Sequence, residues 1–120
     1  MSSSSDRKYC GEGETWAVDA RTLVGSSPGL RAALVAFPPG TRTHWHTHEE
    51  GQVLWIVSGE GWLHVADGEP TRLRPGRAYD VGGHLRHWHG AVAGTWLEHV
   101  AVTLGKTVWE EPSDYPDDNQ

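Results

Sequence analysis

At 120 residues, with 37% hydrophobic side chains, the chain has the size of a single domain that can bury a core of its own. Its formal net charge of −6 excludes a broad basic surface for neutralising phosphates, so we predict no nucleic-acid partner. No apolar run reaches the ~18 residues of a membrane span and no hydrophobic leader opens the sequence, so we expect a cytoplasmic protein with no membrane partner.

The two ends of the chain differ in composition from its middle. Residues 1–14 are polar and glycine-rich, which predicts a flexible arm because they have too little apolar surface to offset ordering. Residues 110–120 form an acidic tail interrupted by prolines, for which no regular structure is expected. The remaining residues, 15–109, are predicted to form one folded domain.

Short apolar runs separated by glycine and proline turns fill this middle part. The runs predict strands at 15–24, 30–37, 53–58, 62–66, 71–73 and 95–104, the last of these being the final strand. Residues 82–86 are predicted to form the loop that precedes His87. No stretch has a helical period, and many short strands at regular spacing predict an all-β, antiparallel barrel.

Three histidines, His44, His46 and His48, follow the strand predicted at 30–37 and alternate with other residues. In one extended strand they would share a face, because side chains repeat every second residue. Imidazole is a common ligand of Zn, Cu, Fe and Ni, so this face is predicted to bind a metal.

The glycines around these histidines match the first motif of the cupin superfamily, which reads Gly, five residues, His-x-His, three or four residues, Glu, six residues, Gly. Here Gly40 and Gly59 frame His46 and His48, and Gln52 stands where the motif has Glu.

A competing register would use His44, His46 and Glu50 and would restore the acidic residue. Pro38 and Val57 would then stand at the two glycine positions, where the motif fails. The first register is therefore preferred.

A second cupin motif is expected further along, in the form Gly, five residues, Pro-x-Gly, two residues, His, three residues, Asn. Gly76 and His87 fit its spacing, whereas Gly82, His84 and Ala91 replace the Pro, Gly and Asn. Together the two motifs cover just under half of the chain. The resemblance implies a single-domain cupin, a double-stranded antiparallel jelly-roll β-barrel.

The chain also resembles the small bacterial cupins that act as manganese-dependent hydroxynitrile lyases. The positions that carry this resemblance are Thr43, Trp45–His48, Gly51–Gln52, Gly61–Trp62, Pro75–Gly76, His87–Ala91 and His99. The resemblance implies a metal held by three histidines and one glutamine. These ligands are His46, His48, Gln52 and His87.

Two further active-site histidines of that family correspond to His89 and His99. His89 shares the strand parity of His87 and His99 lies on the strand predicted at 95–104, so both rings can face the metal and act as acid or base near neutral pH. The alternative for each is a hydrogen bond to water at the barrel rim. His44 stands where the family has a small residue, and it is predicted to shape the site or to hold an anionic product.

The resemblance implies a lyase in which a metal binds the substrate hydroxyl or carbonyl oxygen while a histidine moves a proton. Neutral ligands leave a divalent ion its full charge, which favours anionic substrates or developing negative charge. Mn²⁺ or Fe²⁺ is expected, with Ni²⁺ and Zn²⁺ open. The alternatives are an iron-dependent dioxygenase, a natural-product cyclase or isomerase, and a non-catalytic small-molecule-binding cupin.

The expected partners are a small-molecule substrate and a second copy of the chain. The abundance of tryptophan favours an aromatic or largely apolar substrate. The tryptophans concerned are Trp45, Trp55, Trp62, Trp88 and Trp96. A strand around Trp16 with an unpaired edge predicts a homodimer.

Overall fold

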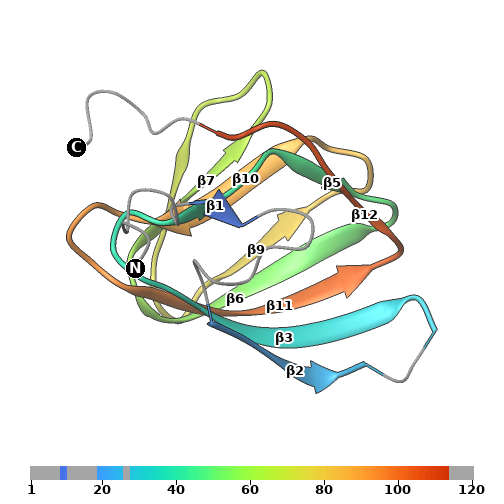
Figure 1. The fold of residues 1–120 in the computed structure, drawn as a ribbon, viewed down its shortest axis with the longest axis horizontal. Coiled ribbons are helices and arrows are strands. Elements are labelled where there is room, and N and C mark those ends of the chain that lie inside the picture. The colour runs from blue at the N-terminus through green and yellow to red at the C-terminus, as the bar shows by residue number, and fades with distance from the viewer. Residues whose placement is uncertain (1–8, 11–18, 26–27, 114–120) are drawn as a thin grey trace, which may run out of the picture.

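The computed structural model describes residues 9–10, 19–25 and 28–113, which form two β-sheets packed face to face (Figure 1). These residues contain no helix, membrane-spanning or otherwise. The all-β, antiparallel fold that the sequence predicts is therefore confirmed.

One sheet has seven strands and the other has five. The first contains β1 (Tyr9–Cys10), β4 (Arg42–Thr43), β5 (His46–His48), β7 (Gly61–Val65), β8 (Thr71–Leu73), β10 (His87–Ala91) and β12 (Thr107–Trp109). The second runs in the order β2 (Asp19–Val24), β3 (Leu30–Phe37), β11 (Leu97–Leu104), β6 (Gly51–Gly59), β9 (Ala78–Val81). All strand pairs are antiparallel except β1 with β4.

Alternating side chains on β6 show how one face of each sheet comes to be buried. Leu54 and Ile56 are buried, while Val53, Trp55 and Val57 between and beside them are exposed. The inward residues of both sheets form a single apolar core. Its buried members are Phe37, Leu54, Ile56, Leu63, Leu73, Val81, Ala91, Leu97 and Ala101.

Two of the motif glycines occupy backbone conformations that suit glycine. Gly40 has a φ of 76° and Gly59 has a φ of 83°. A Cβ atom on Gly59 would lie 1.8 Å from the carbonyl oxygen of Trp96, so any other residue would push β6 away from the chain that precedes β11. This close approach explains the glycine that closes the first motif.

Several predicted segments have the expected positions in the structure. The strands predicted at 30–37 and 71–73 have these bounds, and residues 82–86 form the loop before His87. The first predicted strand appears as β2 from Asp19, while its residues 15–18 lie outside the described part of the chain.

The short strands β9 and β12 are among those that were not predicted, and one prediction about strand order is wrong. The segment predicted at 95–104 is not the final strand, because β12 follows it and pairs with β5. β12 has only three residues, too few to show a period, and β9 has four, of which Ala78 and Asp80 are exposed. Neither segment contains an apolar run that sequence patterns detect.

The predicted single strand through residues 44–48 is also wrong, because β5 begins at His46 and the backbone bends at Trp45. The Trp45 amide donates a hydrogen bond to the carbonyl oxygen of Glu111 at 2.9 Å. This pairing with the segment after β12 interrupts the strand, so the alternation that places His46 inward does not extend to His44.

The terminal segments are described only in part. Tyr9–Cys10, within the predicted arm, pair with β4, and the rest of that arm lies outside the described residues. Residues 110–113 of the predicted tail have no regular structure. Ser113 is nevertheless buried, and its hydroxyl donates to the carbonyl oxygen of Thr43 at 2.7 Å.

Candidate functional site

The four residues predicted to bind a metal meet between the two sheets. His46 and His48 come from β5, His87 from β10 and Gln52 from β6, and all four are 5% exposed or less. The ring centroid of His46 lies 4.2 Å from that of His87 and 4.8 Å from that of His48. The rings of His48 and His87 are 5.1 Å apart. The fold thus brings both cupin motifs to one place.

Backbone carbonyls hold the outer nitrogens of two of these rings. Nδ1 of His46 lies 2.8 Å from the carbonyl oxygen of His44, and Nδ1 of His87 lies 2.9 Å from that of Leu85. A carbonyl only accepts, so each Nδ1 carries the proton and each Nε2 keeps a lone pair. Metal-binding histidines are oriented in this way.

The third ring, that of His48, leaves a buried nitrogen without a partner. Its Nδ1 lies 2.9 Å from Thr107 Oγ1, while its Nε2 is buried and has no hydrogen-bond partner in the described part of the protein. Buried polar atoms are nearly always paired, so this unpaired nitrogen indicates a position for a ligand.

Gln52 presents its amide oxygen to the histidines. Its amide nitrogen donates to Thr103 Oγ1 at 2.9 Å, which leaves Oε1 at 3.4 Å from His87 Nε2. Both facing atoms are acceptors, because the proton of His87 is on the other nitrogen. A cation between them would satisfy both, so the residues present fit a divalent ion.

Burial keeps these imidazoles in the neutral form that binds metals. Burial, reinforced by the neighbouring His87, lowers the pKa of His48 to about 4. The same causes place the pKa of His46 well below its ordinary value, and burial also lowers the pKa of His87.

His89 and His99 form a buried pair next to the predicted ligands. His99 Nε2 lies 3.3 Å from His89 Nδ1, and the other nitrogen of each ring has no hydrogen-bond partner among the described residues. The Phe37 ring packs against both, with its centroid 5.8 Å from His89 and 5.2 Å from His99. Burial lowers the pKa of His99 to about 4, and burial together with the neighbouring His99 holds the pKa of His89 well below its ordinary range.

His89 is also close to the predicted ligands. Three ring nitrogens, one each from His46, His87 and His89, lie within 4.8 Å of one another. This group could itself hold a metal ion. His89 is therefore placed either to bind the ion or to act beside it.

His44 sits at a different position from the other histidines. It is half-buried, and its Nδ1 lies 3.0 Å from the carbonyl oxygen of Glu110 in the segment after β12. Its predicted catalytic role stays a prediction.

Three neighbours of the site were not found from the sequence. Trp109 pairs with His46 across β12 and β5, and the two ring centroids are 4.5 Å apart. Thr107 and Thr103 contact the predicted ligands from outside. Thr103 shares the strand parity of His99 and could have been proposed, whereas the short β12 carries no signal that points to Trp109 or Thr107.

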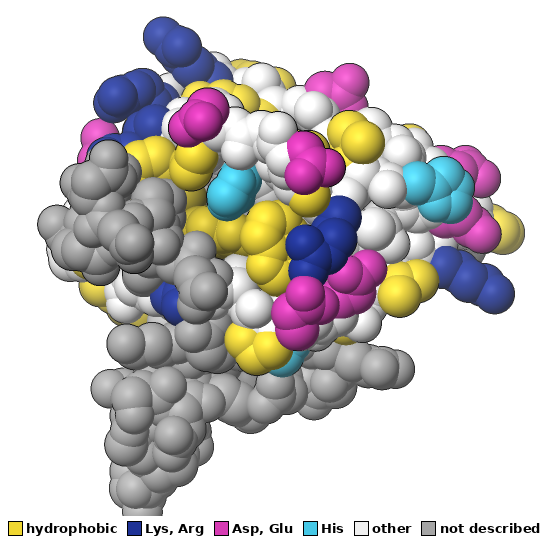
Figure 2. All heavy atoms as spheres, turned by 90° about the horizontal axis from the view of Figure 1, so that it is seen from above, with side chains coloured by type: hydrophobic (Ala, Val, Ile, Leu, Met, Phe, Trp, Pro, Cys, Tyr) yellow, Lys and Arg dark blue, Asp and Glu magenta, His cyan; other side chains and the backbone are white. Residues whose placement is uncertain are grey.

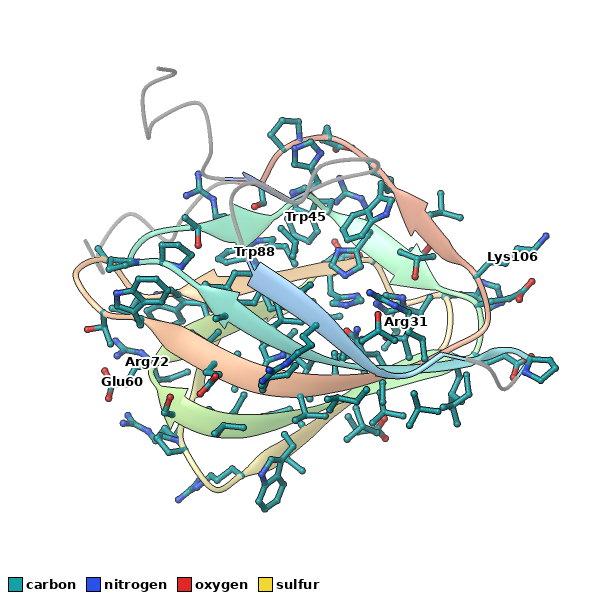
Figure 3. All side chains as sticks on the ribbon, turned by 60° about the horizontal axis from the view of Figure 1, so that its bottom comes forward. Arg31, Trp45, Glu60, Arg72, Trp88 and Lys106 are labelled. Carbon is teal, nitrogen blue, oxygen red and sulfur yellow. The ribbon has the colours of Figure 1, made fainter. Side chains whose placement is uncertain are left out.

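Four of the tryptophans predicted to favour an aromatic substrate are turned away from the histidine cluster. Trp55 and Trp96 are exposed, at 49% and 56%. Trp45 and Trp88 both contact the ring of His64, with centroid distances of 5.4 Å and 6.0 Å, and lie near one another in Figure 3. These four tryptophans therefore do not line the site.

A charged clamp holds the segment after β12 against the loop before β10. Arg86 pairs with Glu110 at 2.6 Å and with Glu111, and its guanidinium carbon lies 4.2 Å from the centroid of the Trp45 ring. Figure 2, which looks down from above, shows basic and acidic side chains side by side near the centre of that face. The clamp keeps β12 next to the predicted ligands.

Comparisons with known proteins agree with the fold. The Cupin domain family profile matches residues 33–102. The (R)-mandelonitrile lyase of Granulicella tundricola is 41% identical over 76 residues, which are 62% of this chain and 58% of that protein. The L-ectoine synthase of Bordetella avium is 32% identical with the same coverage. The matched region therefore spans little more than half the length of these curated relatives.

Solved structures share the fold over most of the chain. A cupin-like protein from Thermotoga maritima has a TM-score of 0.76 and 26% identity, and the match covers 83% of this chain and 84% of that one. The DMSP lyase DddQ from Ruegeria pomeroyi has a TM-score of 0.70 and 20% identity, with coverage of 82% and 54%. The second likeness concerns the fold alone.

Proposed function

We propose that this chain, which belongs to the cupin domain family, is a metal-dependent lyase. Its substrate is a small hydroxy or carbonyl compound in which a carbon–carbon bond is cleaved or formed, as in a hydroxynitrile lyase. The proposal is carried by one observation, the buried pair of His89 and His99 beside four side chains suited to a divalent ion. The mandelonitrile lyase relative supports this reaction type.

In this proposal His46, His48, Gln52 and His87 hold the ion, with Mn²⁺ or Fe²⁺ preferred. Their inner atoms carry lone pairs while their outer atoms are already hydrogen-bonded. A divalent ion bound there supplies Lewis acidity toward the hydroxyl or carbonyl oxygen of the substrate.

His89 moves the substrate proton at its Nε2 atom. This nitrogen has no hydrogen-bond partner among the described residues, and the ring lies beside the predicted ligands His46 and His87. His99 orients the ring through the contact at Nδ1, and Phe37 packs over the pair and keeps water away. His44 is a third candidate, proposed to shape the site from its edge.

Metal content tests the ligand assignment. We expect His46→Ala and His87→Ala to lose a stoichiometric Mn²⁺ that the wild-type protein retains after gel filtration, measured by elemental analysis. His89→Ala is the matched control, because it lies in the same cluster but acts beside the ion. Full occupancy in either ligand variant, or loss of metal from His89→Ala, would contradict this ligand set.

Turnover tests the reaction. We expect Mn²⁺-loaded protein to release cyanide from mandelonitrile without O₂, and His89→Ala and His99→Ala to lose about 10² to 10⁴ in kcat with metal content intact. Unchanged rates in both variants would remove the acid–base role. A requirement for iron and O₂ would point to a dioxygenase, and no turnover of hydroxynitriles or of an aldol-type panel would favour a cyclase, an isomerase or a binding protein.

A further inference from the structure

We propose that Arg31 binds a carboxylate of the substrate, so that the natural substrates are hydroxy or keto acids rather than neutral hydroxynitriles. The inference rests on the proposed function for the place where the reaction occurs. It adds a residue that determines specificity at the edge of that site.

The strand register places Arg31 on the face of the sheet that carries the predicted ligand Gln52. Thr103 on β11 is directly opposite Arg31 on β3 and directly opposite Gln52 on β6. Residues that are directly opposite in antiparallel strands project to the same face. Since Gln52 and Thr103 are hydrogen-bonded to each other within the site, the side chain of Arg31 starts from this inner face.

The same strand register gives the distance between Arg31 and Gln52. Neighbouring strands are ~4.8 Å apart, so the Cα atoms of Arg31 and Gln52 are separated by about 10 Å. Figure 3 shows the Arg31 side chain on the side of β3 that faces the other sheet. A small acid bound beside Gln52 would therefore have its charged end near the guanidinium.

Burial decreases along this part of the barrel toward Arg31. His99 is fully buried, Ala101 is 7% exposed, Thr103 is half-buried, and Arg31 is exposed. Arg31 thus lies at the solvent-exposed end of the site, where an incoming anion would first contact the protein.

Arg31 has no acidic partner in the described part of the chain. Its guanidinium donates a hydrogen bond to the neutral Thr22 Oγ1 at 3.4 Å. Arg72 and Arg74, by contrast, both pair with Glu60, and Figure 3 shows Arg72 beside that residue. The guanidinium of Arg31 is therefore available to bind a carboxylate through two parallel hydrogen bonds.

The predicted ligands themselves favour the same class of substrate. Three histidines and one glutamine contribute no negative charge, so nothing in the ligand set offsets a divalent ion or Arg31. Glu49, in the turn between β5 and β6, carries an acidic group at this end, and its Oε1 accepts a hydrogen bond from the Lys106 amide at 3.3 Å.

Binding of two matched probes to Mn²⁺-loaded protein tests the inference. Mandelate carries the carboxylate, and mandelamide is its neutral counterpart. By isothermal titration calorimetry we expect mandelate to bind about 10-fold more tightly than mandelamide, because a charge-assisted pair contributes roughly 1.5–3 kcal/mol. Arg31→Gln should abolish this preference, and Arg31→Lys should retain part of it.

Arg21→Gln is the matched control. Arg21 is an exposed arginine on the neighbouring strand β2, but it is opposite Leu34 and so belongs to the outer face, in the row that contains Trp55. This variant should bind both probes as the wild type does. Equal affinity of the wild type for the two probes, or an unchanged preference in Arg31→Gln, would overturn the inference.

A parallel assay separates this inference from the proposed function. If the wild type binds mandelate through Arg31 but cleaves no hydroxynitrile or aldol-type compound, the carboxylate site stands and the lyase proposal fails. If it cleaves mandelonitrile and Arg31→Gln has no effect on mandelate affinity, the lyase proposal stands and the carboxylate site fails.

Discussion

Two threonines control how the predicted ligands are oriented. Thr103 accepts the amide hydrogen of Gln52, and Thr107 contacts Nδ1 of His48. Each contact fixes which atom of the ligand faces inward, because an amide or an imidazole offers different atoms on its two sides. Partners of this kind contribute to metal affinity without touching the metal.

Replacing Thr103 by Val removes the acceptor and keeps the shape of the side chain. We expect the Mn²⁺ affinity of Thr103→Val, measured by competition with a chelator, to fall about 10- to 100-fold, because Gln52 can then turn its amide group. Thr103→Ser keeps the hydroxyl and should bind Mn²⁺ as the wild type does. Equal affinities in all three proteins would show that Gln52 needs no such support.

At the scale of one element, β6 connects the core with the site. Its inner face carries Gln52 at one end and then Leu54 and Ile56, which are both fully buried. The strand pairs with β11 along its whole length, with one irregularity between Glu98 and His99. Core packing and ligand position therefore depend on the same strand register.

Two neighbouring substitutions on β6 should have very different costs. Leu54→Ala should lower the free energy of unfolding by about 2–5 kcal/mol, because it leaves a cavity in the core. Val53→Ala, at an outward position that is 38% exposed, should change it by less than about 1 kcal/mol. Urea denaturation of the metal-free proteins measures both, and similar costs would show that the observed alternation does not describe the strand.

At the scale of the whole molecule, the outer face of the five-stranded sheet is the surface best suited to association. Val53, Trp55 and Val57 are exposed on it in one row. Five strands of four to nine residues cover roughly 600 Å² in outline. A standard interface buries about 800 Å² on each partner, so this face would supply most of the area that a second copy needs.

We therefore propose a homodimer through this face. Trp16, around which the sequence predicted the pairing strand, lies outside the described residues. Light scattering at micromolar concentration should show a dimer that Trp55→Glu converts to a monomer, because a buried charge is costly. Val108→Glu is the control, since Val108 is 56% exposed on β12 of the other sheet. A wild-type protein that elutes only at 13.2 kDa would contradict the proposal.

The amino-acid sequence by itself determined the fold class and the residues that meet at the site. Alternation within strands and the spacing of glycines and histidines are local properties, which a chain displays before it folds. The positions of His46, His48, Gln52 and His87 follow from two such spacings. The bounds of β3 and β8 follow in the same way from apolar runs between turns.

Only the tertiary structure decided what surrounds those residues. The bend at Trp45, the contact of Thr107 with His48 and the position of Trp109 all depend on a β12 strand that pairs with residues about 60 positions earlier. Arg31 reaches the row of Gln52 only because β11 lies between β3 and β6. The local sequence of a strand does not indicate which distant strand it pairs with. These contacts are therefore fixed only when the two sheets form.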